Sequence, residues 1–321
     1  MLSLDDVRAA RARIRRFVRE TPLDRTPELG LGDQVYAKLE LVQPTGSFKL
    51  RGALSKLTAL SPAERARGVL TVSAGNHGLA VAWGASMLGV PATVVVPRGA
   101  ARAKVEAIAR YPVELIEEGE GYDAAERWAR QHATRRGLTF ISPYNDREVI
   151  AGQGTIALEI LEALPACDAL IAPAGGGGLL AGLVVAAKAL APKLEIIAVE
   201  PEASPTLSRA LAAGRIVNVE ERATIADGLA GNIEEGSITV PLIAAQLSEV
   251  TLVSEQEIRG AMRRAVEKLH LIVEGSAAVA IAGAVQKQAA LRGKTCALVL
   301  TGRNIGWPEL LAAIAGEEAP A

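Results

Sequence analysis

The chain has few of the residues that mark several classes of protein. Only two of its 321 residues are cysteines, Cys167 and Cys296, so no disulfide framework is available. Both lie in apolar segments, where we expect them to be buried filler. The three histidines, His77, His132 and His270, lack the spacing of metal ligands. This composition is typical of a reducing compartment, and we expect a cytoplasmic protein.

An excess of charge of one sign is also missing. Lysine and arginine contribute 35 residues and the acids 36, which leaves a formal net charge of -1. The basic field that holds nucleic acid is therefore absent, and we expect no nucleic-acid partner.

We expect no membrane-spanning segment, although one apolar run has the required length. Residues 170–187 are uncharged and long enough to cross a bilayer. They include Pro173 and four consecutive glycines, so they predict a strand, a turn and a helix instead. The acidic start of the chain, with Asp5 and Asp6, lacks the basic residues that open a secretory signal. We expect no membrane partner.

Short apolar runs alternate with helical patterns along the chain, which is 50% hydrophobic. A capping box at residues 3–6 predicts a helix to about residue 18, and a strand is expected at 35–42. Three strands each lead through a glycine-containing loop into a helix. This pattern predicts an α/β fold with parallel-rich sheets flanked by helices, in which ligands bind beyond the strand ends. The three loops begin at residues 73, 175 and 301.

Lys49 is placed where a strand gives way to a helix, in the stretch Ser-Phe-Lys-Leu-Arg-Gly-Ala at residues 47–53. The positive end of a helix dipole and the loss of water both favour a neutral amine. A neutral lysine is a nucleophile that forms a Schiff base with an aldehyde. A lysine that simply lies in water is the ordinary alternative.

The four glycines of the second loop precede a helix directly. Without Cβ atoms their N–H groups can converge on a phosphate, assisted by the helix terminus. A flexible turn is the simple alternative. The same loop also fits the dinucleotide pattern G-x-G-x-x-A at residues 176–181, with Glu200 where a ribose-binding acid is expected. An NAD-dependent oxidoreductase therefore stays open, although it gives Lys49 no role. The glycines are Gly175, Gly176, Gly177 and Gly178.

The two other loops carry polar groups at strand ends. A hydroxyl, an amide and an imidazole follow one strand at Ser73, Asn76 and His77, and suit a carboxylate or a phenolic oxygen. A simple helix cap is equally plausible there, and a histidine of this kind is more often packed than a general base. The Thr301 hydroxyl could contact a ring nitrogen without giving that nitrogen a positive charge. Most threonines at strand ends only cap nearby backbone groups.

Several motifs together resemble the fold-type II pyridoxal-phosphate enzymes, nearest the threonine and serine dehydratases and the serine racemases. Residues 47–53 are similar to that family's S-F-K-x-R-G-A block, and residues 73–77 to its S-x-G-N-H loop. The stretches at 150–155, 175–178, 226–228 and 301–304 also correspond. Each motif alone is weak, but their common order covers nearly the whole chain.

The resemblance implies the roles of the site residues. Lys49 would bind pyridoxal 5'-phosphate covalently and move the substrate's α-proton, and the four glycines would hold the cofactor phosphate. Phe48, Asn76, Gly228, Glu274 and Thr301 would contact the cofactor. The small amino-acid substrate would be held by its carboxylate at Ser73, Ala74, Gly75, Asn76 and His77.

Two departures from the pattern bear on function. Racemases of the family place a serine where this chain has Ala74, and alanine cannot transfer a proton. Their cation site corresponds to Glu200 and Ser204, but Thr206 replaces its second acid, so we expect that metal site to be weak or absent, with Glu200 and Ser204 as its weak candidates.

The resemblance implies an organisation and an activity. Residues 1–67 and 145–321 would form a large cofactor-binding domain, with 68–144 as a small inserted domain, in a homodimer. The expected activity is β-elimination and deamination of L-threonine, and of L-serine, to the 2-keto acid and ammonia. A related lyase or racemase acting on serine or 3-hydroxyaspartate is the alternative, and a silent binding protein is a third.

Overall fold

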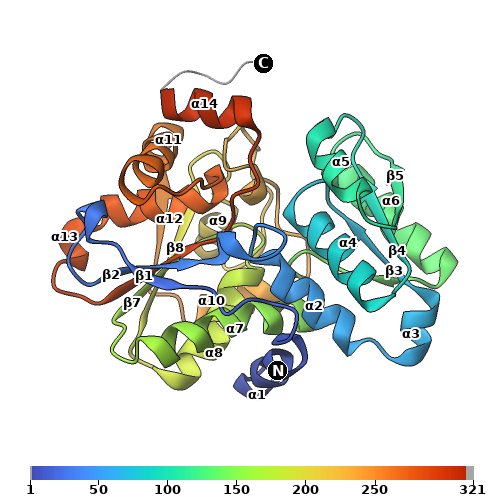
Figure 1. Cartoon of the computed structure of the whole chain (residues 1–321), viewed down its shortest axis with the longest axis horizontal. Coiled ribbons are helices and arrows are strands. Elements are labelled where there is room, and N and C mark those ends of the chain that lie inside the picture. Colours follow the sequence, from blue (N-terminus) through green and yellow to red (C-terminus); the bar gives the residue numbers. More distant parts are fainter. Residues whose placement is uncertain (1, 316–321) are drawn as a thin grey trace.

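The structure, a computed structural model, describes residues 2–315 and contains two mainly parallel sheets (Figure 1). The larger sheet has six strands and the smaller four, and only the β1–β2 pair is antiparallel. The α/β, parallel-rich prediction is therefore confirmed. The larger sheet runs in the order β1 (Leu23–Arg25), β2 (Val35–Leu39), β10 (Cys296–Leu300), β7 (Ala169–Pro173), β8 (Glu195–Pro201) and β9 (Glu249–Val253). The smaller runs β5 (Glu114–Glu117), β4 (Ala92–Val96), β3 (Val69–Val72) and β6 (Thr139–Phe140).

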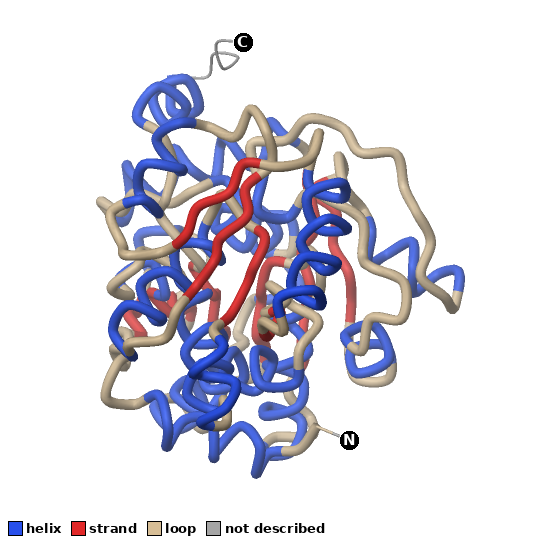
Figure 2. Tube along the Cα trace, turned by 90° about the vertical axis from the view of Figure 1, so that its right-hand side faces the viewer, coloured by secondary structure: helices blue, strands red, loops and turns tan. Residues whose placement is uncertain are grey.

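Helices connect and surround these strands (Figure 2). The α-helices are α1 (Leu4–Ile14), α2 (Lys49–Ala59), α3 (Pro62–Arg67), α4 (Asn76–Leu88), α5 (Arg102–Ala109), α6 (Tyr122–Arg136), α7 (Arg147–Ala163), α8 (Gly178–Leu190), α9 (Thr206–Ala213), α10 (Thr239–Ala244), α11 (Glu255–Arg264), α12 (Gly275–Gln286), α13 (Gln288–Leu291) and α14 (Trp307–Ala315). Shorter helical turns are η1 (Pro27–Leu29), η2 (Glu40–Val42), η3 (Asp227–Leu229) and the π-helical η4 (Ala265–Leu269).

The larger sheet has a core on each face because successive side chains of a strand point to opposite sides. On β7, Leu170 and Ala172 pack with residues of α1, α7 and α8, whereas Ala169 and Ile171 pack with residues of α11 and α12. In Figure 1 these two sets of helices lie on opposite sides of the sheet. Burial on both faces explains why the strands read as continuous apolar runs.

Some boundaries differ from those expected. The first helix has the predicted capping box at Ser3 but ends at Ile14. The strand at Val35 ends at Leu39, and η2 follows, where Glu40 forms an ion pair with the buried Arg51. The edge strands β1 and β9 were not predicted; β9 is only partly buried and lacks a continuous apolar run.

The glycine loops lie where parallel strands end. Strands β7 and β10 are paired in parallel, with Cys296 opposite Ala169, so the loops at 175 and 301 leave the same edge of the larger sheet. The loop at 73 leaves β3 of the smaller sheet, whose strands fall between residues 69 and 140. Among residues 2–315, no helix combines the length and apolarity that a bilayer crossing requires.

Candidate active site

Lys49 is the first residue of α2, and the chain before it is fixed against the end of β10. Ser47 pairs with Gly302 in an isolated antiparallel bridge, and the Phe48 N–H donates to the Thr301 carbonyl at 2.9 Å. The Lys49 Nζ donates to the Pro143 carbonyl at 3.1 Å. Burial lowers the pKa of Lys49 from its ordinary 10.5 to about 8, against the opposing effect of Glu274. The predicted nucleophilic lysine is thus partly buried and easily deprotonated.

The tetraglycine loop forms a tightly packed cradle at the N-terminus of α8. A Cβ on Gly176 would lie 2.5 Å from the Tyr144 ring, and one on Gly178 would lie 2.8 Å from the Tyr144 backbone. Gly177 has a φ of +85°, a backbone angle that residues with a side chain rarely adopt. Within residues 2–315, the N–H groups of 175–180 have no hydrogen-bond acceptor. These unpaired donors at a helix N-terminus suit a phosphate.

The amine and the cradle are joined through one segment at the end of β6. The Pro143 carbonyl accepts from Lys49, and the next residue, Tyr144, covers the glycine loop. The Tyr144 hydroxyl also accepts from the Glu234 N–H at 2.9 Å. Thr239 closes the cradle from another side, because its hydroxyl donates to the Gly176 carbonyl at 2.9 Å. The Lys49 amine and the glycine loop are therefore connected through two consecutive residues, Pro143 and Tyr144.

Glu274 and Asn76 contact each other, Asn76 from the start of α4 after the smaller sheet's β3 and Glu274 from the position before α12, which packs on the larger sheet. The Asn76 Nδ2 donates to the Glu274 Oε1 at 2.8 Å. Burial raises the pKa of Glu274 to about 7, although the hydrogen bond from Asn76 opposes this. Thr301 is buried at the end of β10, next to Gly302, where a Cβ would collide with the Glu274 carboxylate.

The loop after β3 is stabilised by a hydrogen bond to the side chain of its first residue, Ser73. The Ser73 hydroxyl accepts from the Gly75 N–H at 3.1 Å, and Ala74 packs against a small apolar cluster. His77 is buried, with its Nε2 at 3.4 Å from the Ile141 carbonyl. Burial first, and Lys49 second, lower the pKa of His77 to about 3. The imidazole is therefore neutral, as a packed histidine would be.

Gly228 lies on η3, where its N–H donates to the Ser276 hydroxyl at 3.0 Å. The next residue, Leu229, packs against Gly175 at the start of the cradle. Gly228 thus lies one residue from a contact with the cradle.

Glu200 does not have the role that the dinucleotide pattern gave it. Its two carboxylate oxygens accept from the N–H groups of Leu207 and Ser208 at 2.7 and 2.9 Å, so it caps α9. Ser204 is buried close by. Within residues 2–315, no three histidine, cysteine or acidic side chains gather as a metal site would require.

Sequence reasoning missed Pro143, Tyr144 and Thr239. The signal for the first two was available, because they follow the short strand β6 and precede a helix capped by Asp146. A strand end before a helix is where such folds bind ligands. Thr239 gave no local signal, since only the folded chain brings it to Gly176.

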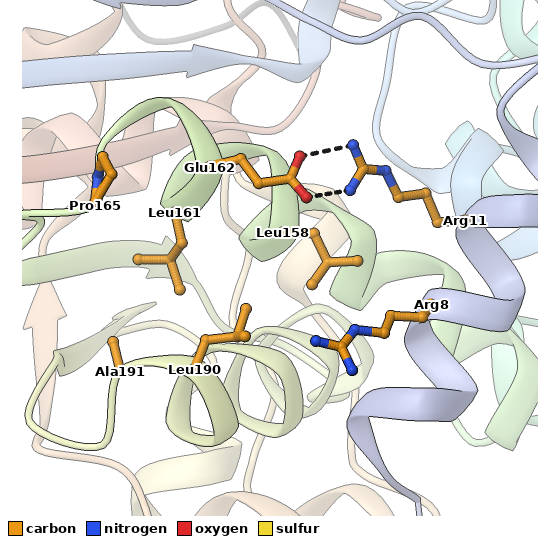
Figure 3. A pocket seen from close by; sticks show the side chains of 8 residues that line it. All are labelled: Arg8, Arg11, Leu158, Leu161, Glu162, Pro165, Leu190 and Ala191. Atoms are coloured by element: carbon orange, nitrogen blue, oxygen red, sulfur yellow. Dashed lines mark hydrogen bonds and ion pairs between the residues drawn. The ribbon is translucent and has the colours of Figure 1, made fainter.

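A separate depression lies on the outer surface, between α1, α7 and α8 (Figure 3). Its volume is about 260 Å³, and Arg11 and Glu162 form a two-pronged ion pair along one side. It contains none of the predicted site residues. Its lining comprises Arg8, Arg11, Leu158, Leu161, Glu162, Pro165, Leu190 and Ala191.

These residues fit pyridoxal phosphate: a partly buried amine for the aldehyde and unpaired N–H groups for the phosphate. The comparisons with known proteins agree. The family model described as "Pyridoxal-phosphate dependent enzyme" matches residues 14–302. The L-threonine ammonia-lyase of Thermotoga maritima is 39% identical over 95% of this chain and 76% of its own. The L-threo-3-hydroxyaspartate ammonia-lyase of Saccharomyces cerevisiae is 39% identical over 98% and 96%.

A solved structure is equally similar. Maize serine racemase superposes with a TM-score of 0.90 at 32% identity, covering 98% of this chain and 97% of that one. Matches of this length and identity, with the Lys49 and glycine-loop geometry, show that the chain belongs to the fold-type II pyridoxal-phosphate dependent enzymes.

Proposed function

We propose that this enzyme is an ammonia-lyase that converts L-threonine, and also L-serine, into the 2-keto acid and ammonia. The observation that carries the proposal is the amine of Lys49, partly buried and beside the segment that covers the glycine cradle. The similarity to an L-threonine ammonia-lyase over 95% of the chain supports it.

The bound pyridoxal phosphate supplies an electron sink for the α-carbon of an attached amino acid. Lys49 would hold the cofactor and then take the α-proton, a task that suits an amine whose pKa is near 8. The Thr301 hydroxyl would meet the pyridine nitrogen without charging it. Contacts with the ring would come from Phe48, Asn76, Gly228 and Glu274, and with the phosphate from Gly175, Gly176, Gly177 and Gly178.

The substrate carboxylate would lie at the loop after β3. There Ser73, Ala74 and Gly75 lead into α4, whose first residues are Asn76 and His77, and a helix N-terminus attracts an anion. His77 would contribute through its backbone, because its buried imidazole is neutral and already contacts Ile141.

The test is a panel of amino acids assayed for keto-acid and ammonia release by the cofactor-loaded protein. Threonine and serine should be turned over, and Lys49→Ala should abolish both the turnover and the visible band of the lysine-bound cofactor. Bound cofactor with no turnover of any β-hydroxy amino acid would refute the ammonia-lyase proposal and favour a binding protein.

Racemisation is tested at Ala74. An alanine on this loop gives the α-carbon no second proton donor, so the wild type should form little D-serine. We expect Ala74→Ser to produce D-serine from L-serine, measured by chiral chromatography, while Ala74→Val serves as the control for a larger side chain. Equal racemisation by wild type and Ala74→Ser would contradict this explanation.

A second substrate, L-threo-3-hydroxyaspartate, is favoured by Arg303. This side chain is exposed beside Gly302 and has no ion-pair partner among residues 2–315. The yeast relative named for this activity matches 98% of the chain. If Arg303 binds the second carboxylate, Arg303→Ala should lower kcat/KM for hydroxyaspartate and leave that for threonine unchanged.

The organisation of the molecule is part of the same proposal. Residues 68–144, which contain the smaller sheet, would form the small domain, and 1–67 with 145–321 the large one. We infer a homodimer from the family resemblance. We infer a cytoplasmic location from the two cysteines, which are buried and unpaired. Light scattering of the purified protein tests the dimer.

A further inference from the structure

Three side chains meet where the two sheets approach each other: Asn76 at the start of α4, Glu274 before α12, and Asn304 after β10. Asn76 is joined to both of the others, at 2.8 Å from Nδ2 to the Glu274 Oε1 and at 2.6 Å from Oδ1 to the Asn304 Nδ2. Asn304 has no role in the function described so far.

The orientation of the Asn304 amide is determined by its surroundings. Its Nδ2 donates to the Thr45 backbone carbonyl at 2.8 Å, and a carbonyl can only accept. Its backbone N–H also donates to the Glu274 Oε2 at 3.2 Å. A Cβ on Gly46 would collide with the Asn304 Oδ1, and Gly46 has a φ of +75°, so only glycine fits there.

The fixed Asn304 amide in turn determines the orientation of the Asn76 amide. Because Asn304 presents an N–H, the Asn76 oxygen must face it, and the Asn76 Nδ2 must face Glu274. The reverse orientation would set an amide oxygen against a carboxylate. Nδ2 carries two hydrogens, so one is left to donate after Glu274 is satisfied.

We propose that Asn304 is a positioning residue that holds the Asn76 amide with its donor side toward Glu274 and the cofactor ring. This inference depends on the proposed contact between Asn76 and the cofactor, but not on the identity of the substrate. Asn304 acts through Asn76 and also contacts Thr45 and Gly46, four and three residues before Lys49.

Asn304→Asp is the direct test, because it keeps the shape and removes both side-chain donors. The apoprotein is titrated with pyridoxal phosphate, and the affinity and the position of the visible band are measured, with thermal unfolding of the apoprotein as a record of folding. We expect the affinity to fall about tenfold or more and the band to shift. Asn304→Ser, which keeps a hydroxyl donor, should restore part of both, and Arg8→Met, at an exposed side chain on α1 outside the site, should change neither.

The double variant separates positioning from a general structural effect. In an Asn76→Ala background, Asn304→Asp should cause no further loss of affinity and no further band shift, since the residue it acts through is gone. Losses that multiply, or an Asn304→Asp protein with unchanged affinity and band, would overturn the proposal. If Asn304→Asp does not fold, Asn304→Ser in the same two backgrounds decides the question. Because the titration uses no amino acid, failure of the ammonia-lyase proposal would leave this result unaffected.

Discussion

At the scale of single residues, the chemistry depends on the charge state of Lys49. A lysine exposed to water is protonated almost completely at neutral pH, whereas burial here lowers its pKa to about 8. Glu274 opposes that effect, and its own pKa is raised to about 7 by burial. The site therefore contains an amine and a carboxyl that both titrate within reach of neutral pH, as catalytic groups often do.

We predict that the apoprotein captures pyridoxal phosphate faster as the pH rises through about 8. Only the neutral amine attacks an aldehyde, and its fraction grows as Lys49 loses its proton. Stopped-flow absorbance between pH 6 and pH 10 measures the rate. Glu274→Gln should move the midpoint to lower pH, because it removes the charge that raises the pKa of Lys49. A rate that still rises steeply at pH 10, as the ordinary lysine pKa of 10.5 would produce, would show that the amine is not buried in solution.

At the scale of elements, the shape of the glycine cradle depends on Tyr144, which packs directly against Gly176 and Gly178. We predict that Gly176→Ala weakens cofactor binding at least tenfold and destabilises the protein by about 1–3 kcal/mol, since the added Cβ meets the tyrosine ring at 2.5 Å. Cofactor titration and urea unfolding measure the two effects.

Two further variants make that test specific. Gly260→Ala in α11 adds a methyl group that meets nothing within 4 Å, so it should be neutral or slightly stabilising. Tyr144→Ala should restore stability to Gly176→Ala but not to Gly178→Ala, whose Cβ meets the tyrosine backbone. Equal rescue of both variants would contradict the packing described here.

A buried ion network fixes α2, and hence Lys49, to its neighbours. Arg51 is fully buried, and its guanidinium donates to Glu40 on η2 and to Glu159 on α7 at 2.6–2.8 Å. Lys38 on β2 lies 2.6 Å from the Glu159 carboxylate. Burial raises the pKa of Glu40, but Arg51 outweighs this and holds that pKa below its ordinary value.

We predict that Arg51→Met destabilises the protein by about 3–5 kcal/mol at pH 7, because it leaves two buried carboxylates with one lysine. Urea unfolding measures this. Arg8→Met should cost almost nothing, since the Arg8 and Asp5 side chains are 57% and 88% exposed.

The pH dependence of the Arg51→Met effect has a definite sign. In the wild type, the lowered pKa of Glu40 contributes stability above pH 4.5 that is lost as the pH falls through the folded-state pKa. In the variant, Glu40 has lost its arginine partner and takes up a proton when it is buried. The free-energy cost of burying its carboxylate therefore decreases as the pH falls. The difference between the two proteins should therefore be smaller at pH 5 than at pH 7. A difference that grows toward acid would contradict this account.

At the scale of the whole molecule, contacts between the two sheets close the site. Lys104 on α5 pairs with Asp227, Arg130 on α6 lies 2.6 Å from Glu234, and Asn76 reaches Glu274. The two ion pairs are partly exposed and contribute little stability. The partly buried amide–carboxylate contact is expected to be the stronger connection, so we expect cofactor binding and the approach of the two sheets to be coupled.

A bound divalent cation is not expected to contribute to the stability of the molecule. Glu200 already accepts two backbone N–H groups at the start of α9, and Thr206 stands where an acid would be needed. We predict that millimolar Mg²⁺ shifts the Tm no more than KCl of equal ionic strength. Thr206→Asp should introduce a saturable increase in Tm. A saturable increase in the wild type would show that a cation site exists.

Much of the site could be predicted from the sequence, because its main residues stand at helix starts or in the loops that follow strands. Lys49 at a helix start, the tetraglycine loop and Thr301 after β10 are all local features, governed by backbone geometry and strand–helix alternation. The helix that ends at Ile14 instead of residue 18 shows the limit of such patterns, since helix ends depend on packing.

The amino-acid order by itself determined the central strands, the glycine loop and the helix that begins at Lys49, since each follows from short-range sterics and hydrogen bonding. Only the tertiary structure decided what these parts meet: the Pro143 carbonyl at the amine, Tyr144 on the glycines, and Asn304 against Asn76. Those partners are 94 and 228 residues apart for the two hydrogen bonds. Such contacts depend on how strands register and sheets pack, and no local pattern encodes that.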